Sequence, residues 1–356
     1  LAGERSPGGA LAVADLADPA ALGRVFITPD GELDRIVEAR DASPEELRQT
    51  TINAGLYALK APAIFEDLAQ IGTDNAQGEL YLTDAVTRAA REGRQVNCFS
   101  LEDPAEAWGV NNRRELALVH RRLLDRHLDA LMISGVTILE PARTSIEPSV
   151  SVEPDAQIHP DVTLLGQTSI GQGTTIHQGS WLRDCDVAAG VEILPYSVLE
   201  GTRISAGARI GPFARLRPGS VIGEGARIGN FVEVKNSDIG PNARANHLAY
   251  LGDATVGAGA NVGAGVVTCN YDGVSKHHTE IGAGAFVGSD TMLVAPVEVG
   301  AGAQTAAGSI ITKNVPDGAL GVGRLRQRNI LGAVERLRAR RPPKEASTSG
   351  EKERKP

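Results

Sequence analysis

Two basic residues in the second half of the chain are spaced so that they could bind a phosphate group together. Arg217 and Lys235 are 18 residues apart, and in a coil with roughly 18 residues per turn such residues project from the same face of neighbouring coils. Two cations on one face favour a phosphate ligand, with a solvated basic face as the alternative. The same segment carries further polar residues suited to substrate binding, namely Arg215, Asn230, Tyr250, Asn261, Asn270, Tyr271 and Lys276.

A histidine in this segment is a candidate general base. His247 follows the cationic pair and precedes two asparagine-bearing coils, and imidazole can accept a proton from an attacking nucleophile near neutral pH. A lone histidine is more often a surface or packed residue, so its neighbours carry the prediction. The adjacent residues His277 and His278 could suggest a metal, but no third ligand is obviously paired with them. We therefore favour acid–base chemistry at His247 over metal binding at His277 and His278.

Small residues recur about one coil apart further along the chain. They occur at Gly288–Asp290, Ala306–Gly308 and Gly321–Gly323, and Arg324 follows the last of them. Small side chains let a long, thin ligand lie against the backbone along the coil, although corner packing explains the same pattern. Arg324 lies just past the last coil, where it could meet a phosphate of such a ligand.

The elements that must position these residues follow a repeat of six. Apolar residues recur at every sixth position in long runs between Val152 and Ile311, a period that fits neither a helix nor an alternating strand. It fits a coil whose sides each consist of one short strand and one tight turn. Glycine often follows the apolar residue, where corners need unusual backbone angles. The pattern predicts a parallel β-helix, with a generic glycine-rich β domain as the alternative.

Composition and charge agree with this fold and disfavour several classes of protein. Glycine is frequent (41 residues) and aromatic residues are few (4%), as a narrow aliphatic bore with tight corners requires. The net charge of −8 does not favour a nucleic-acid partner. Cys98, Cys185 and Cys269 follow no CxxC spacing and indicate reduced thiols in a cytoplasmic protein. No apolar run reaches about 18 residues, so we expect no membrane span.

The amino-terminal part, residues 1–111, mixes strand and helix signals and is expected to form an α/β domain. Strands are predicted at Leu11–Asp15, Gly23–Ile27 and Gln95–Ser100, with a turn at Pro29–Gly31 and a helix from Thr83 to Arg91.

The rest of the chain is expected to form three regions. Residues 112–134 are a linker helix, residues 135–330 are the β-helix, and residues 331–356 are a C-terminal extension with a disordered tail from Arg341 to Pro356. The repeats are expected to stop after Val315. The segment Thr268–Thr279 interrupts the six-residue period, which predicts an inserted loop on one face of the coil.

The ordered motifs of this coil resemble a known family. It is the family of bifunctional bacterial enzymes that acetylate glucosamine-1-phosphate and then uridylylate the product to UDP-N-acetylglucosamine. The resemblance covers nearly the whole chain apart from the tail. In the coil, the matching motifs are Ile210–Pro218, Gly229–Lys235, His247–Asp253, Asn261–Gly265, Thr268–Gly273 and Phe286–Thr291.

This resemblance implies a fold and a first activity. The family's acetyltransferase domain is a left-handed parallel β-helix that forms a homotrimer with active sites between subunits. By motif, His247 would act as general base on the sugar amine, which attacks the thioester of acetyl-CoA. Such acyl transfer needs positioning, a base and oxyanion donors, but no metal.

The same resemblance implies binding roles for other residues of the coil. For glucosamine-1-phosphate, the implied set comprises Arg217, Lys235, Tyr250, Asn261 and Lys276. For acetyl-CoA, the implied set comprises Ala264, Asn270, Tyr271, Ser289, Ala307 and Arg324.

The amino-terminal part resembles the second half of the same family's nucleotidyltransferase domain, which is Rossmann-like. By motif, Gly23, Glu38, Asn53 and Asn111 would contact the UDP-sugar, and Asn111 would also help to hold Mg²⁺. The family's glycine-rich phosphate loop and its metal-binding aspartate are not found between Leu1 and Leu22. Without that loop nothing grips the phosphates of UTP, so we expect the chain as given not to transfer uridylyl groups. The first residue is Leu1 rather than Met, and we expect that an upstream part has been lost.

Three functions remain open from the sequence. The first is an acetyl-CoA-dependent glucosamine-1-phosphate N-acetyltransferase in the pathway to peptidoglycan and lipopolysaccharide precursors. The second is another hexapeptide-repeat acyltransferase with a different amino sugar or acyl donor. The third is a non-catalytic β-helical scaffold, which the presence of His247 and of both phosphate-binding cations disfavours.

Overall fold

The computed structural model describes residues 7–339 and divides the chain into two compact units between Arg126 and His127. The predicted disorder of Arg341–Pro356 falls outside the described residues. The long helix α3 (Arg113–Ile133) contains the division.

The first unit is an α/β domain built on a mixed five-stranded sheet in the order β3-β2-β4-β1-β5. The strand β1 pairs antiparallel with β4 and parallel with β5, and β2 forms an antiparallel hairpin with β3. The elements are β1 (Pro7–Asp15), β2 (Arg24–Ile27), β3 (Leu33–Val37), η1 (Glu46–Arg48), β4 (Thr51–Leu59), α1 (Ala63–Leu68), α2 (Leu82–Arg91), β5 (Gln95–Ser100) and η2 (Pro104–Ala107).

The predicted elements of this unit are confirmed with small shifts. The strand β1 already begins at Pro7 rather than at Leu11, and α2 begins at Leu82 rather than at Thr83. The turn at Pro29–Gly31 joins β2 to β3, and Gly31 takes a positive φ of 82° there, which glycine adopts without strain. A core that includes Leu11, Val25 and Val86 is fully buried.

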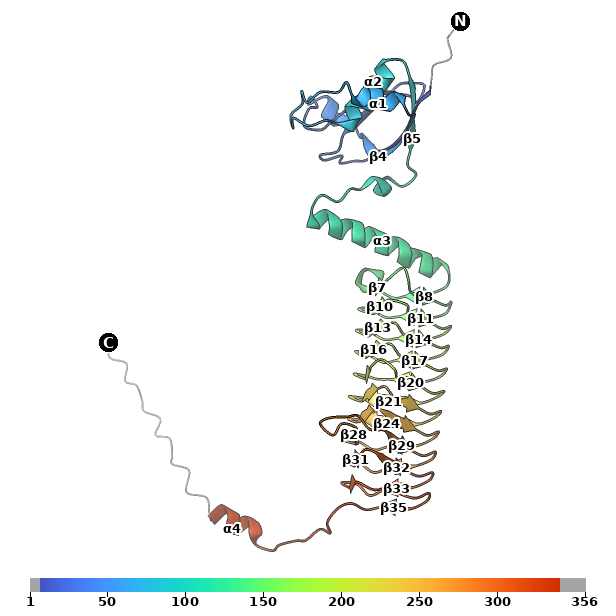
Figure 1. The fold of residues 1–356 in the computed structure, drawn as a ribbon, viewed down its shortest axis with the longest axis vertical. Coiled ribbons are helices and arrows are strands. Elements are labelled where there is room, and N and C mark those ends of the chain that lie inside the picture. Colours follow the sequence, from blue (N-terminus) through green and yellow to red (C-terminus); the bar gives the residue numbers. More distant parts are fainter. Residues whose placement is uncertain (1–6, 340–356) are drawn as a thin grey trace, which may run out of the picture. The chain divides into compact units, whose positions relative to one another are not determined.

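The second unit is a parallel β-helix, as the six-residue period predicted. Its coils stack three sheets of 10, 9 and 11 strands within the described residues, and Figure 1 shows the strands of successive coils lying one above the next. Residues about one coil apart in the sequence are direct strand partners, as in Val198 opposite Arg215 and Arg215 opposite Glu233. Any two residues so spaced are therefore neighbours on one face.

Two of the three faces are named after a candidate site residue that they carry, Arg217 or His247. The 3-10 helix η3 (Pro141–Arg143) precedes the first strand of the Arg217 face. This face consists of β7 (Ser145–Ile146), β10 (Thr163–Leu165), β13 (Trp181–Arg183), β16 (Val198–Glu200), β19 (Arg215–Leu216), β22 (Glu233–Lys235), β25 (Tyr250–Gly252), β28 (Val267–Cys269), β31 (Met292–Val294) and β34 (Ile310–Ile311). Arg217 directly follows β19.

The His247 face has the most strands of the three. It consists of β6 (Thr137–Ile138), β9 (Gln157–Ile158), β12 (Thr175–Ile176), β15 (Glu192–Ile193), β18 (Arg209–Ile210), β21 (Arg227–Asn230), β24 (Arg244–His247), β27 (Asn261–Val262), β30 (Phe286–Val287), β33 (Gln304–Thr305) and β35 (Leu320–Gly321).

The third face completes each coil. It consists of β8 (Ser151–Val152), β11 (Ser169–Ile170), β14 (Asp186–Val187), β17 (Arg203–Ile204), β20 (Val221–Ile222), β23 (Asp238–Ile239), β26 (Ala254–Val256), β29 (Thr279–Ile281) and β32 (Val297–Val299).

Aliphatic side chains from all three faces fill the bore. Ile228, Leu216 and Ile222, one from each face, are all fully buried. Burial of one such side chain stabilises the fold by about 1.5–3 kcal/mol, and the repeat supplies these side chains on every coil.

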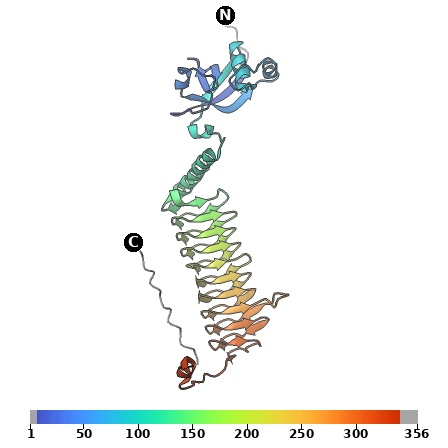
Figure 2. The ribbon, with the colours of Figure 1, turned by 90° about the vertical axis from the view of Figure 1, so that its left-hand side faces the viewer.

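The predicted insertion is confirmed by the strand register. Ala254 pairs directly with Thr279, so the chain between them is longer than one ordinary coil, and the excess leaves the coil as a loop. Figure 2 shows this loop projecting from the side of the coil.

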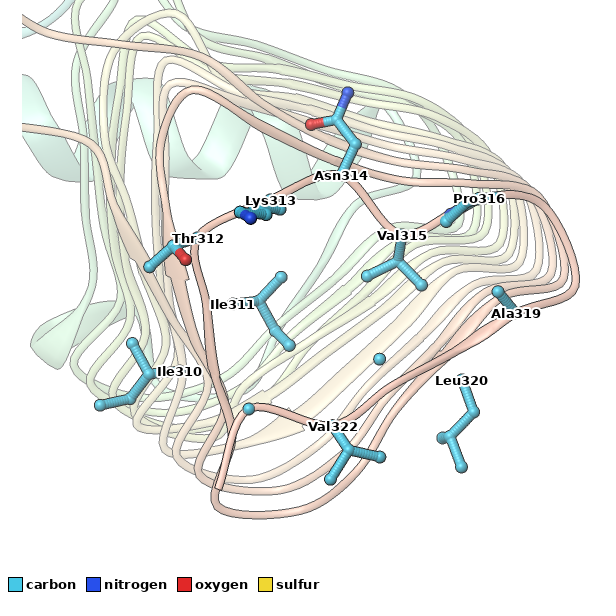
Figure 3. A pocket seen from close by; sticks show the side chains of 12 residues that line it. Ile310, Ile311, Thr312, Lys313, Asn314, Val315, Pro316, Ala319, Leu320 and Val322 are labelled. Carbon is cyan, nitrogen blue, oxygen red and sulfur yellow. The ribbon is translucent and has the colours of Figure 1, made fainter. Parts of the chain in front are cut away.

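The coil continues past Val315, where we expected the repeats to stop. The strand β35 still pairs with β33 in parallel. At Gly321 the usual inward aliphatic residue is missing, and Val315 occupies the space that a Cβ would need there. The apolar period is therefore lost while the strand pairing persists. A cavity of about 340 Å³ lies at this end of the bore, where Ile311 and Val315 point inward (Figure 3). The helix α4 (Ala333–Ala339) follows.

Candidate active site

Arg217 and Lys235 are neighbours on adjacent coils of the Arg217 face. The register pairs Leu216 with Val234, and the Arg217 amide donates to the carbonyl of Val234 at 2.8 Å. The Arg217 guanidinium also pairs with Glu233, with Nη1 3.1 Å from Oε1, and both side chains remain about two-fifths exposed. Arg217 and Lys235 therefore lie side by side, as their spacing in the sequence predicted.

The inserted loop brings a third cation to this pair. Tyr271 and Lys276 form an antiparallel bridge within the loop, and the loop is closed where His277 donates its amide to the carbonyl of Asn270 at 2.8 Å. The contact with Lys235 and the repulsion between the two ammonium groups lower the pKa of Lys276. A pair of ammonium groups held this close is an electrostatic site for a phosphate dianion.

Asp253 is a partly buried partner of two amides close to Lys235 and Lys276, and no pattern in the sequence singles it out. Its carboxylate accepts from the side-chain amides of Asn236 and Asn270. Burial raises the pKa of Asp253, but these two hydrogen bonds and the charges of Lys235 and Lys276 outweigh it, and the net pKa is lowered. The carboxylate therefore stays ionised and anchors the base of the inserted loop.

Tyr250 approaches Asn270 at a glycine. A Cβ on Gly252 would overlap the Tyr250 hydroxyl and would lie 2.8 Å from Nδ2 of Asn270. Glycine is therefore required for the close approach of these two polar groups. Tyr250 is partly buried on the same face as Arg217 and Lys235.

His247 ends β24 on the adjacent His247 face. Its Nδ1 lies 2.8 Å from Oδ1 of Asn230, and the register places these two residues directly opposite each other. Because the amide oxygen can only accept, Nδ1 carries a proton, and in the neutral imidazole the lone pair is then on Nε2. This is the tautomer that a general base needs. The imidazole is exposed and can meet a ligand directly.

A cavity of about 300 Å³ lies at His247. One side of it needs glycine, because a Cβ on Gly229 would overlap the carbonyl of Asn246. Its full lining is Leu194, Arg209, Gly211, Arg227, Ile228, Gly229, Asn230, Asn246 and His247. The cavity therefore combines a basic nitrogen, amides and two guanidinium groups on one face.

The residues implied for acetyl-CoA fall into two places. Ala264, Ser289 and Ala307 occupy the position of His247 in successive coils, since Ala245, Val262, Val287 and Thr305 are partners in turn. The register continues this column at Gly323. Arg324 is the next residue, with its Cδ 3.8 Å from where a Cβ of Gly308 would lie. Asn261 lies on the same face in β27. Asn270 and Tyr271 lie instead in the inserted loop beside the Arg217 face.

Comparison with known proteins identifies the family. Relatives named "Bifunctional protein GlmU" include those of Sorangium cellulosum, 48% identical over 93% of this chain and 69% of the relative, and of Methylococcus capsulatus, 45% identical over 96% and 74%. The chain belongs to the GlmU family. The prediction of this family is therefore confirmed.

Two further comparisons describe parts of this GlmU-family chain. A family model described as the GMPPB C-terminal domain matches residues 146–250. Among solved structures, UDP-N-acetylglucosamine O-acyltransferase from Moraxella catarrhalis is 14% identical, covers 58% of this chain and 77% of that chain, and has a TM-score of 0.32.

The amino-terminal unit of this GlmU-family chain gathers three of the four residues implied for a UDP-sugar. The amide of Asn53 donates to the carbonyl of Gly23 at 3.0 Å. A Cβ on Gly23 would lie 3.3 Å from both carboxylate oxygens of Glu38, and Thr83 Oγ1 donates to Glu38 at 2.9 Å. Asn111 lies just before α3, where its amide donates to Glu115 at 2.7 Å.

The histidines of the inserted loop have partners other than a metal. Nε2 of His277 lies 2.7 Å from Oδ2 of Asp272, and Nε2 of His278 lies 3.0 Å from Oγ1 of Thr255. Within residues 7–339, no group of three or more His, Cys, Asp or Glu side chains could hold a metal ion. In the same range, no helix is both long and apolar enough to cross a membrane.

Proposed function

We propose that this chain catalyses the acetyl-CoA-dependent N-acetylation of glucosamine-1-phosphate. The observation that carries the proposal is the hydrogen bond from His247 to Asn230, which in the neutral imidazole puts the lone pair on Nε2 beside a cavity. Membership of the GlmU family and the cations Arg217, Lys235 and Lys276 support the same reaction. The pathway is that to UDP-N-acetylglucosamine, and we propose a cytoplasmic location.

The proposed step is a direct transfer of the acetyl group. The sugar amine attacks the carbonyl carbon of the thioester, and Nε2 of His247 takes the proton that the amine gives up. The carbon–sulfur bond then breaks, and the same proton passes to the departing thiolate of coenzyme A. A neutral imidazole with the proton on Nδ1 is the form required at the start.

The sugar phosphate is assigned to the cations of the Arg217 face. Arg217, Lys235 and Lys276 would bind the phosphate, while Tyr250 and Asn261 would position the sugar ring. The close approach of Lys235 and Lys276 supports this assignment, because a phosphate dianion would relieve their mutual repulsion.

Acetyl-CoA is assigned to the column that begins at His247. Ala264, Ser289 and Ala307 would let the pantetheine arm lie along the backbone, and Arg324 would meet a phosphate at its far end. Asn270 and Tyr271 would contact the same ligand from the inserted loop.

We propose a homotrimer because these assignments draw on two faces of the coil. His247 and the acetyl-CoA column lie on one face, whereas the phosphate-binding cations and the inserted loop lie at the adjacent face. A groove between the His247 face of one copy and the Arg217 face of another would bring the two sets together.

For the amino-terminal unit we propose contacts of Gly23, Glu38, Asn53 and Asn111 with a UDP-sugar. The grouping of Gly23, Glu38 and Asn53 supports this proposal. The described residues do not by themselves fit a Mg²⁺ site at Asn111. Its single amide oxygen is one suitable ligand, but the nearby Glu115 carboxylate already accepts from Asn111 and Asn112. We derive no step through a metal.

The first test is a thiol-release assay with acetyl-CoA and glucosamine-1-phosphate, with the His247→Ala variant as control. We expect release of coenzyme A by the wild type and a large loss in the variant. Release with another amino sugar but not with glucosamine-1-phosphate would support a different acyltransferase, and no release with any amino sugar would support a scaffold. Pyrophosphate release from UTP and N-acetylglucosamine-1-phosphate is measured beside it and tests the expected lack of uridylyl transfer.

A further inference from the structure

Three arginines form a ladder on the His247 face. Arg209, Arg227 and Arg244 are direct partners in β18, β21 and β24. Neighbouring strands are about 4.8 Å apart, so the three outward-pointing side chains start close together. We call these three residues the arginine ladder.

Like charges placed directly opposite each other destabilise a sheet, and several other positions of this coil pair opposite charges instead, although Glu280 faces Glu298 on the third face. Glu192 is the next residue in the same row, and its Oε2 lies 2.9 Å from Nε of Arg209. On the third face Arg203 stands opposite Asp186. Three successive arginines are therefore unfavourable for folding unless their charge is offset, and an anionic ligand would offset it.

Arg227 is the member of the ladder that is free to bind such a ligand. Arg209 is committed to Glu192, whereas Arg227 is exposed and forms no ion pair with any residue in the described range 7–339. Arg227 also lines the cavity that contains His247, and Arg244 does not. Of the two cations in the lining of this cavity, Arg227 is therefore the one without an ion pair to any described residue.

The height of Arg227 along the coil matches that of the phosphate-binding cations. Arg227 in β21 and Lys235 in β22 belong to one coil, and Arg209 and Arg217 belong to the coil before it. The cation rows of the two faces therefore run level with each other. In the groove proposed between the His247 face of one copy and the Arg217 face of another, a phosphate would meet both rows at the same height along the coil.

We propose that Arg227 binds the phosphate of the amino-sugar substrate from the His247 side, together with Arg217 and Lys235. This inference rests on the proposed function and adds a binding residue and a requirement for a phosphate-bearing ligand. The phosphate of the sugar and those of acetyl-CoA share the same chemistry, so the experiment separates them.

The test measures KM for each substrate in the Arg227→Gln variant. We expect KM for glucosamine-1-phosphate to rise by roughly tenfold to a hundredfold, since charge-assisted hydrogen bonds are the strong ones, with KM for acetyl-CoA unchanged. Arg227→Lys keeps the charge and should recover part of the loss. Arg203→Gln, an exposed arginine on the third face, is the matched control and should leave both KM values unchanged.

A second measurement uses glucosamine, which lacks the phosphate. Wild type and Arg227→Gln should acetylate glucosamine with equal kcat/KM, because the lost contact has no partner in this substrate. A defect that persists with glucosamine, or a rise in KM for acetyl-CoA alone, would overturn the assignment. If the wild type acetylates glucosamine-1-phosphate and Arg227→Gln has the same KM, only this inference fails. If the wild type does not acetylate it, the proposed function fails first.

Discussion

Replacing Asn230 with alanine isolates the one contact that sets the state of the proposed base. In the structure Oδ1 of Asn230 accepts from Nδ1 of His247 at 2.8 Å. Alanine at position 230 removes this acceptor while leaving His247 in place. Both residues are strand partners in β21 and β24, so the backbone pairing does not depend on the lost side chain.

The size of the effect follows from the type of hydrogen bond. A neutral N–H to amide-oxygen bond contributes a net 0.5–1.5 kcal/mol, about 1 kcal/mol in the typical case. If all of it holds the imidazole in the productive tautomer and orientation, its loss lowers kcat by about 3- to 10-fold. KM for both substrates should stay unchanged, because Asn230 is assigned to the base and not to a ligand.

The assay is steady-state thiol release for the wild type, Asn230→Ala, His247→Ala and the double variant. Once His247 is gone, the Asn230 substitution should have no further effect, since it acts only through the imidazole. An equal loss in both backgrounds would show that Asn230 acts on something else. The Asn230→Asp variant tests the same contact through the direction of a pH shift. A carboxylate stabilises the imidazolium, so the acidic limb of the pH–rate profile should move to higher pH. No movement would refute the contact with His247.

The remaining predictions concern the base, the phosphate site and the assembly. His247→Ala should lower kcat by about 100-fold or more with the oligomer intact on size-exclusion chromatography; near-normal turnover removes His247 from the base role. Arg217→Ala should raise KM for sugar phosphate and leave kcat similar, and an unchanged KM moves the phosphate site elsewhere. Because Lys235 lowers the pKa of Lys276, Lys276 loses its charge at a lower pH than a free lysine. KM for sugar phosphate should therefore rise on the alkaline side, and Lys235→Met should move that rise to higher pH; an unmoved rise contradicts the coupling. Co-refolded His247→Ala and Lys276→Ala chains should regain about one quarter of the sites if each site takes one face from each of two copies, whereas no regain would place both residues in one chain's site.

The coil itself could be predicted because the inward-pointing apolar residues that form it recur periodically in the sequence. Inward residues such as Ile210, Leu216 and Ile222 recur at every sixth position, and all three are fully buried in the bore. The same regularity explains why the stacking of Arg217 on Lys235 could be derived from spacing alone. Where one residue breaks the period, as at Gly321, the pattern vanishes although the strand pairing continues.

The polar contacts beneath the site could not be predicted in the same way. Asn236, Asp253 and Asn270 are each 17 residues apart, so the repeat places them on successive coils, but it does not show that both amides donate to the carboxylate. The period ends at Cys269, so it also does not show where the inserted loop places Lys276. The role of Asp253 depends on the folded loop that returns Lys276 to Lys235. That contact is set by tertiary structure and not by the local sequence.

The arginine ladder is the opposite case, since steps of about one coil connect Arg209, Arg227 and Arg244 in the sequence itself. The step from Arg227 to Arg244 is shorter by one position than the step from Arg209 to Arg227, so a search at a constant period misses the alignment. Only the register shows that the row is continuous. Once the row is known, the cations of the Arg217 face suggest a reason for it. A run of cations on the His247 face, level with those on the Arg217 face, is unfavourable in a free chain and would be stabilised by a bound anion. This is the physical reason for proposing that the two faces, contributed by neighbouring copies, form the two walls of one phosphate site.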